Sequence, residues 1–529
     1  VWGMIPDDVD LPDDLATAHR LIRELTATLH QQNHLIAKLQ HQLEQLLRQR
    51  YGRKSEQVAP DQLLLFAREI LAEAEPQVPA TQPDPDPTPA PTRPKPNGHG
   101  RKPLPASLPR QRVVHDVPPE QRLCPDCGAE RRPIGEELRE QLEYVPASLI
   151  VLQHVRPKYA CATCAANVVI AERLPEPIEK GLPGPGLLAH VAVSKYADHL
   201  PLYRQEGILR RHGVALSRST LCDWMAAAAG LLAPIVQAML KRVLQSEVIQ
   251  TDDTPVKVQD HDGQGIKTGR LWNYRGDHDH RYTVYDYTPD RSRDGPERIL
   301  KGFRGDLQAD ADSAYDGLFA DGSIVEVGCW MHARRKFYEA RTSAPERSHL
   351  VLAWVGRLYE IEEDAKEARR EHPEWDEATW HAHRFRLRRE HSRPILDAIR
   401  EWLGAQQPEV LPKSPIGEAI GYALNHWEAL IRPLEAGFLE IDNGASERAL
   451  KPVAIGRKNW LFAGSDNGGK TAAVLMSLCT SCKDLGVDPL AYLRDVLERV
   501  STHPNSRIEE LLPDRWEPAE APEPGDRKG

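Results

Sequence analysis

The chain has 529 residues, enough for three or four domains of about 150 residues each, which excludes a single small module. Its 40% hydrophobic residues fit a globular protein, while 44 Pro indicate some linker. With 68 Lys and Arg against 78 Asp and Glu, the net charge is −10, so nucleic-acid contacts would have to come from local basic patches. No apolar run of about 18 residues is present, so we expect a cytoplasmic protein with no membrane partner.

The N-terminal region carries a heptad pattern. From Leu15 to Leu46 a 3-4 spacing selects ten positions, nine of them apolar and one, Gln32, polar. The polar flanks favour a coiled coil over an amphipathic helix packed on its own domain. We therefore expect residues 11–55 to form a helical arm that joins copies of the chain into a homo-oligomer.

Two segments are expected to lack a packed core. Within residues 76–110, 12 of 35 residues are Pro and the apolar residues have no period, which predicts an extended linker. Residues 501–529 are expected to be a disordered tail. The folded domains should therefore lie between these segments, with the helical arm tethered in front of them.

Four of the eight cysteines lie in two Cys-x-x-Cys pairs, with 33 residues between the pairs. Each pair can offer two thiolates to one tetrahedral ion, and Pro125 and Gly128 suit the turn of a zinc knuckle. A redox pair, or four unrelated core thiols, is the alternative. We predict a structural Zn²⁺ module over residues 111–175, with the ligands Cys124, Cys127, Cys161 and Cys164.

Three helices are predicted within residues 181–240, over 187–197, over 201–211 and from Ser217 onward, where hydroxyls can cap the third helix. Gly213 should end the second helix. The spacing is that of a helix-turn-helix, although a purely structural bundle would show the same pattern. The candidate phosphate contacts of this region are Arg204, Arg210, Arg211 and Arg218.

Downstream, the pattern changes to strands. Residues 245–340 are predicted to form a mixed sheet with a helix between its third and fourth strands, and residues 341–440 are helix-rich, hold five of the 11 Trp and include the basic stretch 384–389. Residues 441–500 should form the second part of the core together with C-terminal helices. The fold class is therefore multidomain α/β, with a sheet core interrupted by an all-helical insertion.

Three acidic sites fall at informative places on that sheet. Asp252 lies where the first strand is predicted to end, Asp310 follows the fourth strand, and Glu447 opens a helix after the insertion. Carboxylates at adjacent strand ends, joined by one from a helix, can hold two Mg²⁺ ions for phosphoryl transfer. Each acid alone also has a structural explanation, as a turn, a cap or one member of an i,i+4 pair.

The sequence motifs around these acids resemble those of the insertion-sequence 66 family of bacterial transposases. The resemblance runs from about Leu15 to Leu497 and includes both Cys-x-x-Cys pairs. The other matching pieces are Tyr51-Gly-Arg-Lys-Ser-Glu56, Pro201-Leu-Tyr-Arg204, Ser217-Arg-Ser-Thr-Leu221, Thr251-Asp-Asp-Thr-Pro255, Leu307-Gln-Ala-Asp310, Cys329-Trp-Met-His-Ala-Arg-Arg-Lys-Phe337, Glu447-Arg-Ala-Leu450 and Gly456-Arg-Lys-Asn-Trp-Leu-Phe462.

The resemblance implies an RNase H-like DDE core split by a helical insertion, with Asp252, Asp310 and Glu447 as the catalytic, Mg²⁺-binding triad. The sequence departs from the family pattern at Asp253, usually Glu, and at residues 311–313, usually a Gly-Tyr type of turn. Both departures leave the triad intact.

Further residues near these motifs are candidates for the site. Cys329 and His332 resemble a Cys-x-x-His element of several DDE transposases, although a buried thiol and a capping His would look the same. Asp442 is expected to be a turn or N-cap residue before the helix that carries Glu447. The cations and the aromatic residue expected to bind DNA near the acids are Arg334, Arg335, Lys336, Arg448, Lys451, Arg457, Lys458 and Trp460.

These features predict a DNA transposase that binds the ends of its insertion sequence and cuts and joins DNA strands. Its partners would be double-stranded DNA, as terminal repeats and target, and a second copy of the chain; a need for accessory proteins encoded by the element is left open. The rival hypotheses are a DNA-binding regulator whose core has decayed and an RNase H-like nuclease. Mg²⁺-dependent nicking separates the first rival, and strand joining separates the second.

Overall fold

The computed structural model describes His19 and residues 149–154, 158–159, 169–170, 175–179, 181–260 and 265–518. The predicted coiled-coil arm, the Pro-rich linker and the end of the chain after residue 518 lie outside the described residues, as do the four cysteines predicted to bind zinc. Of the predicted zinc module, the described part holds a small antiparallel pair, β1 (Lys158–Tyr159) with β2 (Val169–Ile170).

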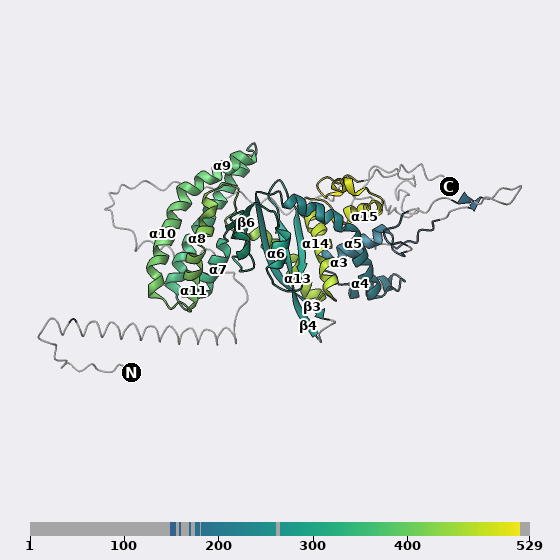
Figure 1. The fold of residues 1–529 in the computed structure, drawn as a ribbon, viewed down its shortest axis with the longest axis horizontal. Helices are drawn as coiled ribbons and strands as arrows, with labels where there is room; N and C mark the ends of the chain where they lie inside the picture. Colours follow the sequence, from purple (N-terminus) through teal and green to yellow (C-terminus); the bar gives the residue numbers. More distant parts are fainter. Residues whose placement is uncertain are drawn as a thin grey trace, which may run out of the picture. The chain divides into compact units, whose positions relative to one another are not determined.

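A five-stranded mixed sheet forms the centre of the part described after residue 181 (Figure 1). Its order is β5-β4-β3-β6-β7; the three strands from β3 to β5 are antiparallel, and β6 and β7 run parallel to β3. The mixed α/β sheet with a helix before the fourth strand confirms the coarse prediction. The strands are β3 (Val248–Asp260), β4 (Gly265–Arg275), β5 (Thr283–Thr288), β6 (Gly305–Gln308) and β7 (Ile324–Val327), with α6 (Asp294–Ile299) before β6 and η2 (Asp316–Phe319) after it.

The first strand does not end where its sequence predicts. β3 continues to Asp260 and pairs with β4 along its whole length, so Asp252 lies inside the strand and not at its end. The prediction ended the strand within residues 251–255. Pro255 cannot donate a hydrogen bond to a ladder. Here the β6 pairing of β3 stops at Gln250, so Pro255 lies where β3 has no β6 partner to receive an N–H group.

Helices that precede the strands in the chain and helices that follow them share one hydrophobic core with the sheet. The largest cluster of buried side chains joins apolar residues of the strands, such as Trp272, with those of the N-terminal and C-terminal helices, such as Leu221 and Leu475. In Figure 1 these helices lie together on one side of the sheet. They are α3 (Pro185–Tyr196), α4 (Leu202–Arg211), α5 (Arg218–Val243), α13 (Gly444–Trp460), α14 (Asp466–Asp484) and α15 (Pro489–Arg499).

The three helices predicted for residues 181–240 are present, with the expected caps. Ser217 accepts a hydrogen bond from the Thr220 N–H at 3.2 Å, and Gly213 has a φ of +82°. However, α5 is 26 residues long and buries Leu221, Trp224 and Leu232 in the common core. It is also the one described helix long and apolar enough to cross a membrane, a test that a buried core helix equally passes.

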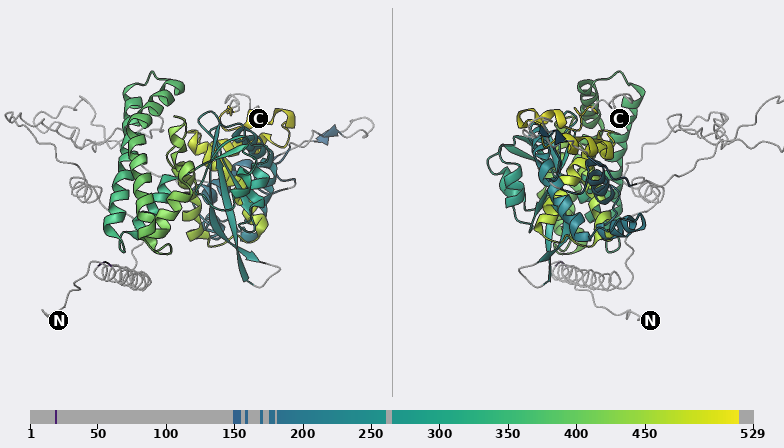
Figure 2. Two further views of the ribbon diagram at one scale, coloured as in Figure 1. Left: turned by 60° about the vertical axis from the view of Figure 1, so that its left-hand side comes forward. Right: turned by 90° about the vertical axis from the view of Figure 1, so that its right-hand side faces the viewer.

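A second group of helices has a hydrophobic core of its own and stands beside the sheet (Figure 2). The prediction began this helical block at residue 341, but Trp330, Ala333 and Phe337 of the preceding helix belong to its core. We call residues 330–434 the helical block. It contains α7 (Trp330–Ala340), α8 (Pro345–Glu371), α9 (Glu377–Leu387), the π-helix η3 (Arg388–Ser392), α10 (Arg393–Gln406), η4 (Gln407–Glu409), α11 (Pro415–Asn425), α12 (Trp427–Ile431) and η5 (Arg432–Leu434).

The expected disorder from residue 501 is wrong up to residue 518. η6 (Asn505–Leu511) is a 3-10 helix, and Leu511 and Leu512 are fully buried in the main core. The Tyr492 hydroxyl donates a hydrogen bond to the Leu511 carbonyl at 2.6 Å. The sequence of this segment is charged and contains Pro, which predicted disorder. Its two buried leucines nevertheless hold the segment on α15 and α5.

Candidate active site

Two of the predicted acids lie side by side because their strands are neighbours. In the parallel pair β3–β6, Gln250 is opposite Gln308. Asp252 and Asp310 each follow two residues later, where β6 has ended, and neighbouring strands are about 4.8 Å apart. A side-chain period of two then points both carboxylates to the same face as the two glutamines.

Asp252 is the most perturbed acid of the site. Its N–H donates to the Asn273 side-chain oxygen at 3.1 Å, and its Oδ1 accepts from the Asp253 N–H at 2.7 Å. Burial, together with the charges of Asp310 and Glu447, raises the pKa of Asp252 to about 8. The three acids are therefore close enough for their charges to repel one another.

Asp310 lies in a tight turn after β6. Its Oδ1 accepts a hydrogen bond from the Asp312 N–H at 3.2 Å, and its carbonyl accepts one from the Tyr422 hydroxyl at 3.1 Å. Burial, together with the charge of Asp312, raises the pKa of Asp310. Ala311 has a φ of +60°, a conformation that suits glycine better than alanine.

Asp253, next to the first acid, has a structural role. Its side chain is 3% exposed and pairs with Arg270 and Arg291, each at 2.9 Å. Arg291 also pairs with Asp312 at 2.9 Å. Asp253 thus neutralises two arginines and ties β3 to β4 and to the turn after Asp310.

Glu447 reaches the strand acids because three buried polar residues fix the start of α13. Asn273 of β4 donates to the Ser446 carbonyl at 2.8 Å and accepts from the Ser446 hydroxyl at 2.5 Å. Asn443, the N-cap residue, donates to the Thr251 carbonyl at 3.2 Å. These three residues were missing from the prediction, since nothing in the sequence distinguishes them from other polar residues.

The Cys-x-x-His element lies against the third acid. His332 Nε2 is 3.4 Å from Glu447 Oε1, and one ligand atom each of Cys329, His332 and Glu447 lie within 4.8 Å of one another. Burial raises the pKa of Cys329 to about 12. Burial lowers the pKa of His332, with Arg335 acting in the same direction and Glu447 opposing it, so the imidazole is neutral near pH 7.

The donor set of the site suits a hard divalent cation. Glu447 Oε1 is buried and accepts no hydrogen bond from the described residues. The negative charges of Asp310 and Glu447 help to raise the pKa of Asp252, so a shared cation would stabilise the three partly buried carboxylates, and oxygen ligands are those Mg²⁺ prefers. The residues that could hold such an ion are Asp252, Asp310 and Glu447.

Asp442, the other acid before α13, is engaged elsewhere. Its Oδ1 accepts from the Gly444 N–H at 2.8 Å, and its Oδ2 accepts from the Tyr359 hydroxyl at 2.7 Å. This is the expected turn residue, placed one position before the N-cap.

A cleft of about 360 Å³ opens beside Asp310. Its walls combine two cations, Arg335 and Lys336, with the acids Asp312 and Glu339. Lys336 Nζ lies 4.8 Å from the centre of the Tyr422 ring, and Arg335 is 4.0 Å from Glu447. Arg334, on the same helix, stacks on Tyr338 instead. The cleft can accommodate an anionic group next to the acids.

The cations predicted on α13 divide into two groups. Arg448, Lys451 and Lys458 are exposed. Arg457 is used internally, since it donates to the Thr254 hydroxyl at 2.9 Å and to the Pro255 carbonyl at 2.8 Å. Trp460, at the end of the helix, packs partly against the main core.

The four arginines of the N-terminal helices are not brought to the acids. Arg204, Arg210, Arg211 and Arg218 are all exposed. Their partners are local, as in the pair of Arg210 with Glu206 at 2.8 Å. In Figure 1, α4 lies on the side of the sheet opposite to the helical block. Any phosphate that these arginines contact would therefore be distant from the cleft.

The fold and the site thus define a class of protein with a partly buried carboxylate cluster at a mixed sheet, next to a cleft that Arg335 and Lys336 help to line. The Transposase IS66 family matches residues 180–471, the zinc-finger binding domain of transposase IS66 matches residues 121–165, and the IS66 C-terminal element matches residues 477–513. The family described as Transposase C of IS166 homeodomain matches residues 38–113. The chain belongs to the IS66 family of transposases.

Relatives of similar length occur in Sinorhizobium fredii (strain NBRC 101917 / NGR234). The uncharacterized protein y4qI is 36% identical over 95% of this chain and 93% of its own length. The uncharacterized protein y4hP is 33% identical over 92% and 90%, respectively. Family membership confirms the resemblance found in the sequence, supports a transposase role and a zinc-finger module, and leaves the chemistry of the site to be inferred.

Proposed function

We propose that the protein is a DNA transposase that binds the ends of its insertion sequence and catalyses Mg²⁺-dependent strand cleavage and strand transfer by a DDE mechanism. The observation that carries the proposal is the convergence of Asp252, Asp310 and Glu447, which come from β3, from the turn after β6 and from α13. The sheet and α13 would then be an RNase H-like core, and the helical block its insertion.

In this mechanism the three carboxylates would hold two Mg²⁺ ions, and the bound ions would supply activation of the attacking hydroxyl and stabilisation of the leaving oxygen in an in-line displacement. The protein's own groups bind and orient the DNA. Lys336 and Arg335 line the cleft beside Asp310 and can contact the phosphates on either side of the scissile bond. The exposed Arg448, Lys451 and Lys458 extend this cationic surface along α13.

The remaining parts of the chain supply assembly and recognition in this proposal. The N-terminal arm, residues 11–55, joins protomers, and Cys124, Cys127, Cys161 and Cys164 bind one structural Zn²⁺ ion, which fits the zinc-finger match to residues 121–165. The zinc module and the exposed arginines of α4 and α5 would contact the ends of the element. The chain acts in the cytoplasm, where its DNA substrate is.

An in vitro strand-transfer assay tests the proposal. The substrate is a duplex with the DNA that flanks the gene, incubated with the full chain and Mg²⁺ or with EDTA. We expect nicking at the element end and joining of the 3′-hydroxyl to a target plasmid, both abolished in Asp252→Asn. DNA binding without any nicking would favour the decayed regulator, and nicking without joining would favour the nuclease.

A further inference from the structure

A short segment, Gly437–Asn443, connects the helical block to the helix that carries Glu447. On the sheet side, the Gln308 side chain donates to the Glu440 carbonyl at 2.7 Å, and the Gln250 side chain donates to the Asp442 carbonyl at 3.4 Å. These glutamines precede Asp310 and Asp252 by two residues. The segment is therefore in direct contact with the strands that carry the other two acids.

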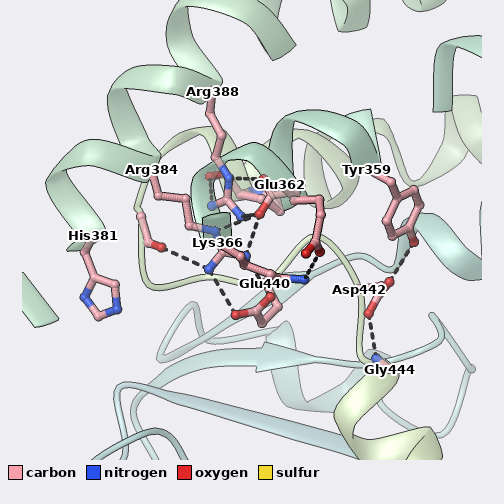
Figure 3. Close-up of polar contacts among 12 residues, drawn as sticks. Tyr359, Glu362, Lys366, His381, Arg384, Arg388, Glu440, Asp442 and Gly444 are labelled. Carbon is pink, nitrogen blue, oxygen red and sulfur yellow. Dashed lines mark hydrogen bonds and ion pairs between the residues drawn. The ribbon is translucent and has the colours of Figure 1, made fainter. Parts of the chain in front are cut away.

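Two buried arginines of the helical block hold the same stretch of chain from the opposite side (Figure 3). Arg384 donates to the Gly437 carbonyl at 3.3 Å and to both carboxylate oxygens of Glu440, at 3.0 and 2.7 Å. Arg388 donates to the carbonyls of Pro433 and Ala436 at 2.8 and 3.0 Å. Each arginine thus binds one or two backbone carbonyls directly.

Glu362 of α8 neutralises both arginines. It accepts from Arg384 at 2.7 Å and from Arg388 at 2.6 and 2.9 Å, and the three side chains are only 2–4% exposed. Burial alone would raise the pKa of Glu362, but the hydrogen bonds and charges of the arginines outweigh it and hold this pKa below its usual value. All members of the network are thus charged.

A buried ionic network is weak evidence for stability, because well-packed apolar residues often hold a core equally well. What apolar residues cannot do is bind carbonyl groups in fixed directions. Arg388 also begins a π-helical turn, a local irregularity that is frequent at functional sites. The network therefore fits a role in orienting the backbone that it binds better than a role in packing.

A second contact reaches the start of α13 itself. The Tyr359 hydroxyl of α8 donates to Asp442 Oδ2 at 2.7 Å, and Asp442 Oδ1 accepts from the N–H of Gly444, the first residue of α13 (Figure 3). Glu447 lies three residues further, in the first turn. A displacement of Asp442 would therefore be transmitted to the helix that orients this carboxylate.

We propose that Glu362, Arg384, Arg388 and Glu440, together with Tyr359, are positioning residues that set the third carboxylate of the site, Glu447, from the helical block. The proposal rests on the proposed function, since it assigns these residues a role toward the cation-binding acids. The helical block would thus complete the site on the side that the sheet leaves open.

Two conservative substitutions and their combination test this role. Tyr359→Phe removes one hydroxyl, and Glu440→Gln removes a charge but keeps an oxygen for Arg384; the carboxylate of Glu440 is 46% exposed, which limits the loss of folding. Asp397→Asn is the matched control, because it also alters an Arg–carboxylate pair of the helical block, with Arg393 on its own helix at 2.9 Å.

The primary measurement needs no DNA and no turnover. Binding of Mn²⁺ to the full chain is followed by electron paramagnetic resonance, and amide hydrogen exchange is measured for residues 444–448. We expect the double variant to bind Mn²⁺ about 10-fold more weakly, as is typical when groups behind metal ligands are removed, and to exchange these amides faster. Asp397→Asn should leave both values unchanged.

Cleavage provides a second readout. In the double variant, the Mg²⁺ concentration for half-maximal cleavage should rise while DNA affinity stays constant. If the wild type binds Mn²⁺ and cleaves DNA, and the folded double variant matches it in cation affinity and amide exchange, the positioning role is wrong and the proposed function stands. If the wild type itself binds no Mn²⁺ and cleaves no DNA, the proposed function fails, and the positioning role with it.

Discussion

The two ends of α13 are held in different ways. At the N-terminal end, Asn443, Gly444 and Ser446 are buried, and their side chains or backbone are hydrogen-bonded to β3, to β4 and to Asp442, which Tyr359 of the helical block contacts. At the C-terminal end, Lys458 and the two residues that follow Trp460 are exposed, while Arg457 is hydrogen-bonded to β3. One helix thus combines a fixed end, which carries Glu447, with a more exposed, free end, which carries cations and apolar side chains.

The two ends differ because one has to place a carboxylate at a cation and the other has to contact a DNA backbone. A carboxylate that shares a cation with two others must be placed to within about 0.5 Å, which requires several converging hydrogen bonds. A surface that contacts a DNA backbone needs charge more than rigid placement, because phosphate contacts are electrostatic. We therefore expect substitutions at the fixed end to alter chemistry and folding, and substitutions at the free end to alter affinity.

The largest effect is expected at the fixed end, from Glu447→Gln. Losing one cation ligand should reduce Mg²⁺-dependent cleavage by about 10²- to 10³-fold or more, because the metal supplies several kcal/mol of transition-state stabilisation. Folding and DNA binding should be nearly unchanged. Asp442→Asn keeps a side-chain oxygen for the Gly444 N–H, so it should cost about 1 kcal/mol or less of helix stability and reduce cleavage far less than Glu447→Gln. Cleavage that survives in Glu447→Gln and is lost in Asp442→Asn would reverse the assignment.

A second effect at the same end concerns folding. Asn273→Ala would leave the Asp252 N–H and the Ser446 hydroxyl and carbonyl without their partner. Several unpaired buried polar groups should lower the free energy of unfolding by roughly 2–4 kcal/mol, measured in urea. Arg457→Met, which loosens the free end, should cost about 1 kcal/mol. Equal costs for the two variants would contradict the contrast between the ends.

This contrast also shows where sequence reasoning succeeds. Alternating and apolar runs predicted where the strands lie along the chain, and the family resemblance pointed to three acids whose charges the fold brings near one another, because both signals are local. The partner of Asn273 is 173 positions away, and the partner of Gln250 on the loop before α13 is 192 away. A buried amide in a strand therefore looks like any other polar residue until the fold brings its partner to it.

The buried arginines show the same limit for charged residues. Arg384 and Arg388 belong to a basic stretch that resembles a solvated helix face in sequence, yet both are 2% exposed. Likewise, the first strand was predicted to end near Asp252, because the sequence does not reveal that β4 pairs with β3 along its whole length. Burial depends on elements distant in the chain, and residue type alone does not encode it.

The pH dependence of stability tests the repulsion at the fixed end. The pKa of Asp252 is about 8 in the fold and near 3.8 in the unfolded chain, so the folded protein keeps a proton that the unfolded chain releases. Its contribution to the free energy of unfolding therefore falls as the pH rises from about 4 to about 8.

In Asp252→Asn this contribution is absent. The difference in unfolding free energy between the wild type and this variant, measured in urea without divalent cations, should change by about 1 kcal/mol or more between pH 6 and pH 8. Added Mn²⁺ should restore the wild type most at pH 8. Parallel pH profiles for the two proteins would show that the fold does not raise the pKa of Asp252 as described.

A smaller effect is expected at the free end, from Lys458→Ala. This side chain is exposed, so its removal should leave the fold unchanged and weaken binding of an end-containing duplex severalfold at low salt. The slope of log affinity against log salt should decrease by about one unit if the ammonium contacts a phosphate. The rate of cleavage at saturating DNA should stay the same. An unchanged slope would exclude this residue from the contact.

The smallest effect is expected from Leu461→Gly, directly after α13. Leu461 has φ +64° and ψ −47°, and the Phe462 N–H donates to the Trp460 carbonyl at 2.8 Å, which makes a strained γ-turn. Glycine relieves this strain, worth roughly 1 kcal/mol, but also gives the unfolded chain more freedom. Because the leucine side chain is 63% exposed, little packing is lost.

The variant should therefore be more stable by less than about 1 kcal/mol in urea unfolding. If it also binds the duplex more weakly than the wild type, the strain keeps an apolar side chain in place for DNA; a loss of stability would mean that the turn is not strained.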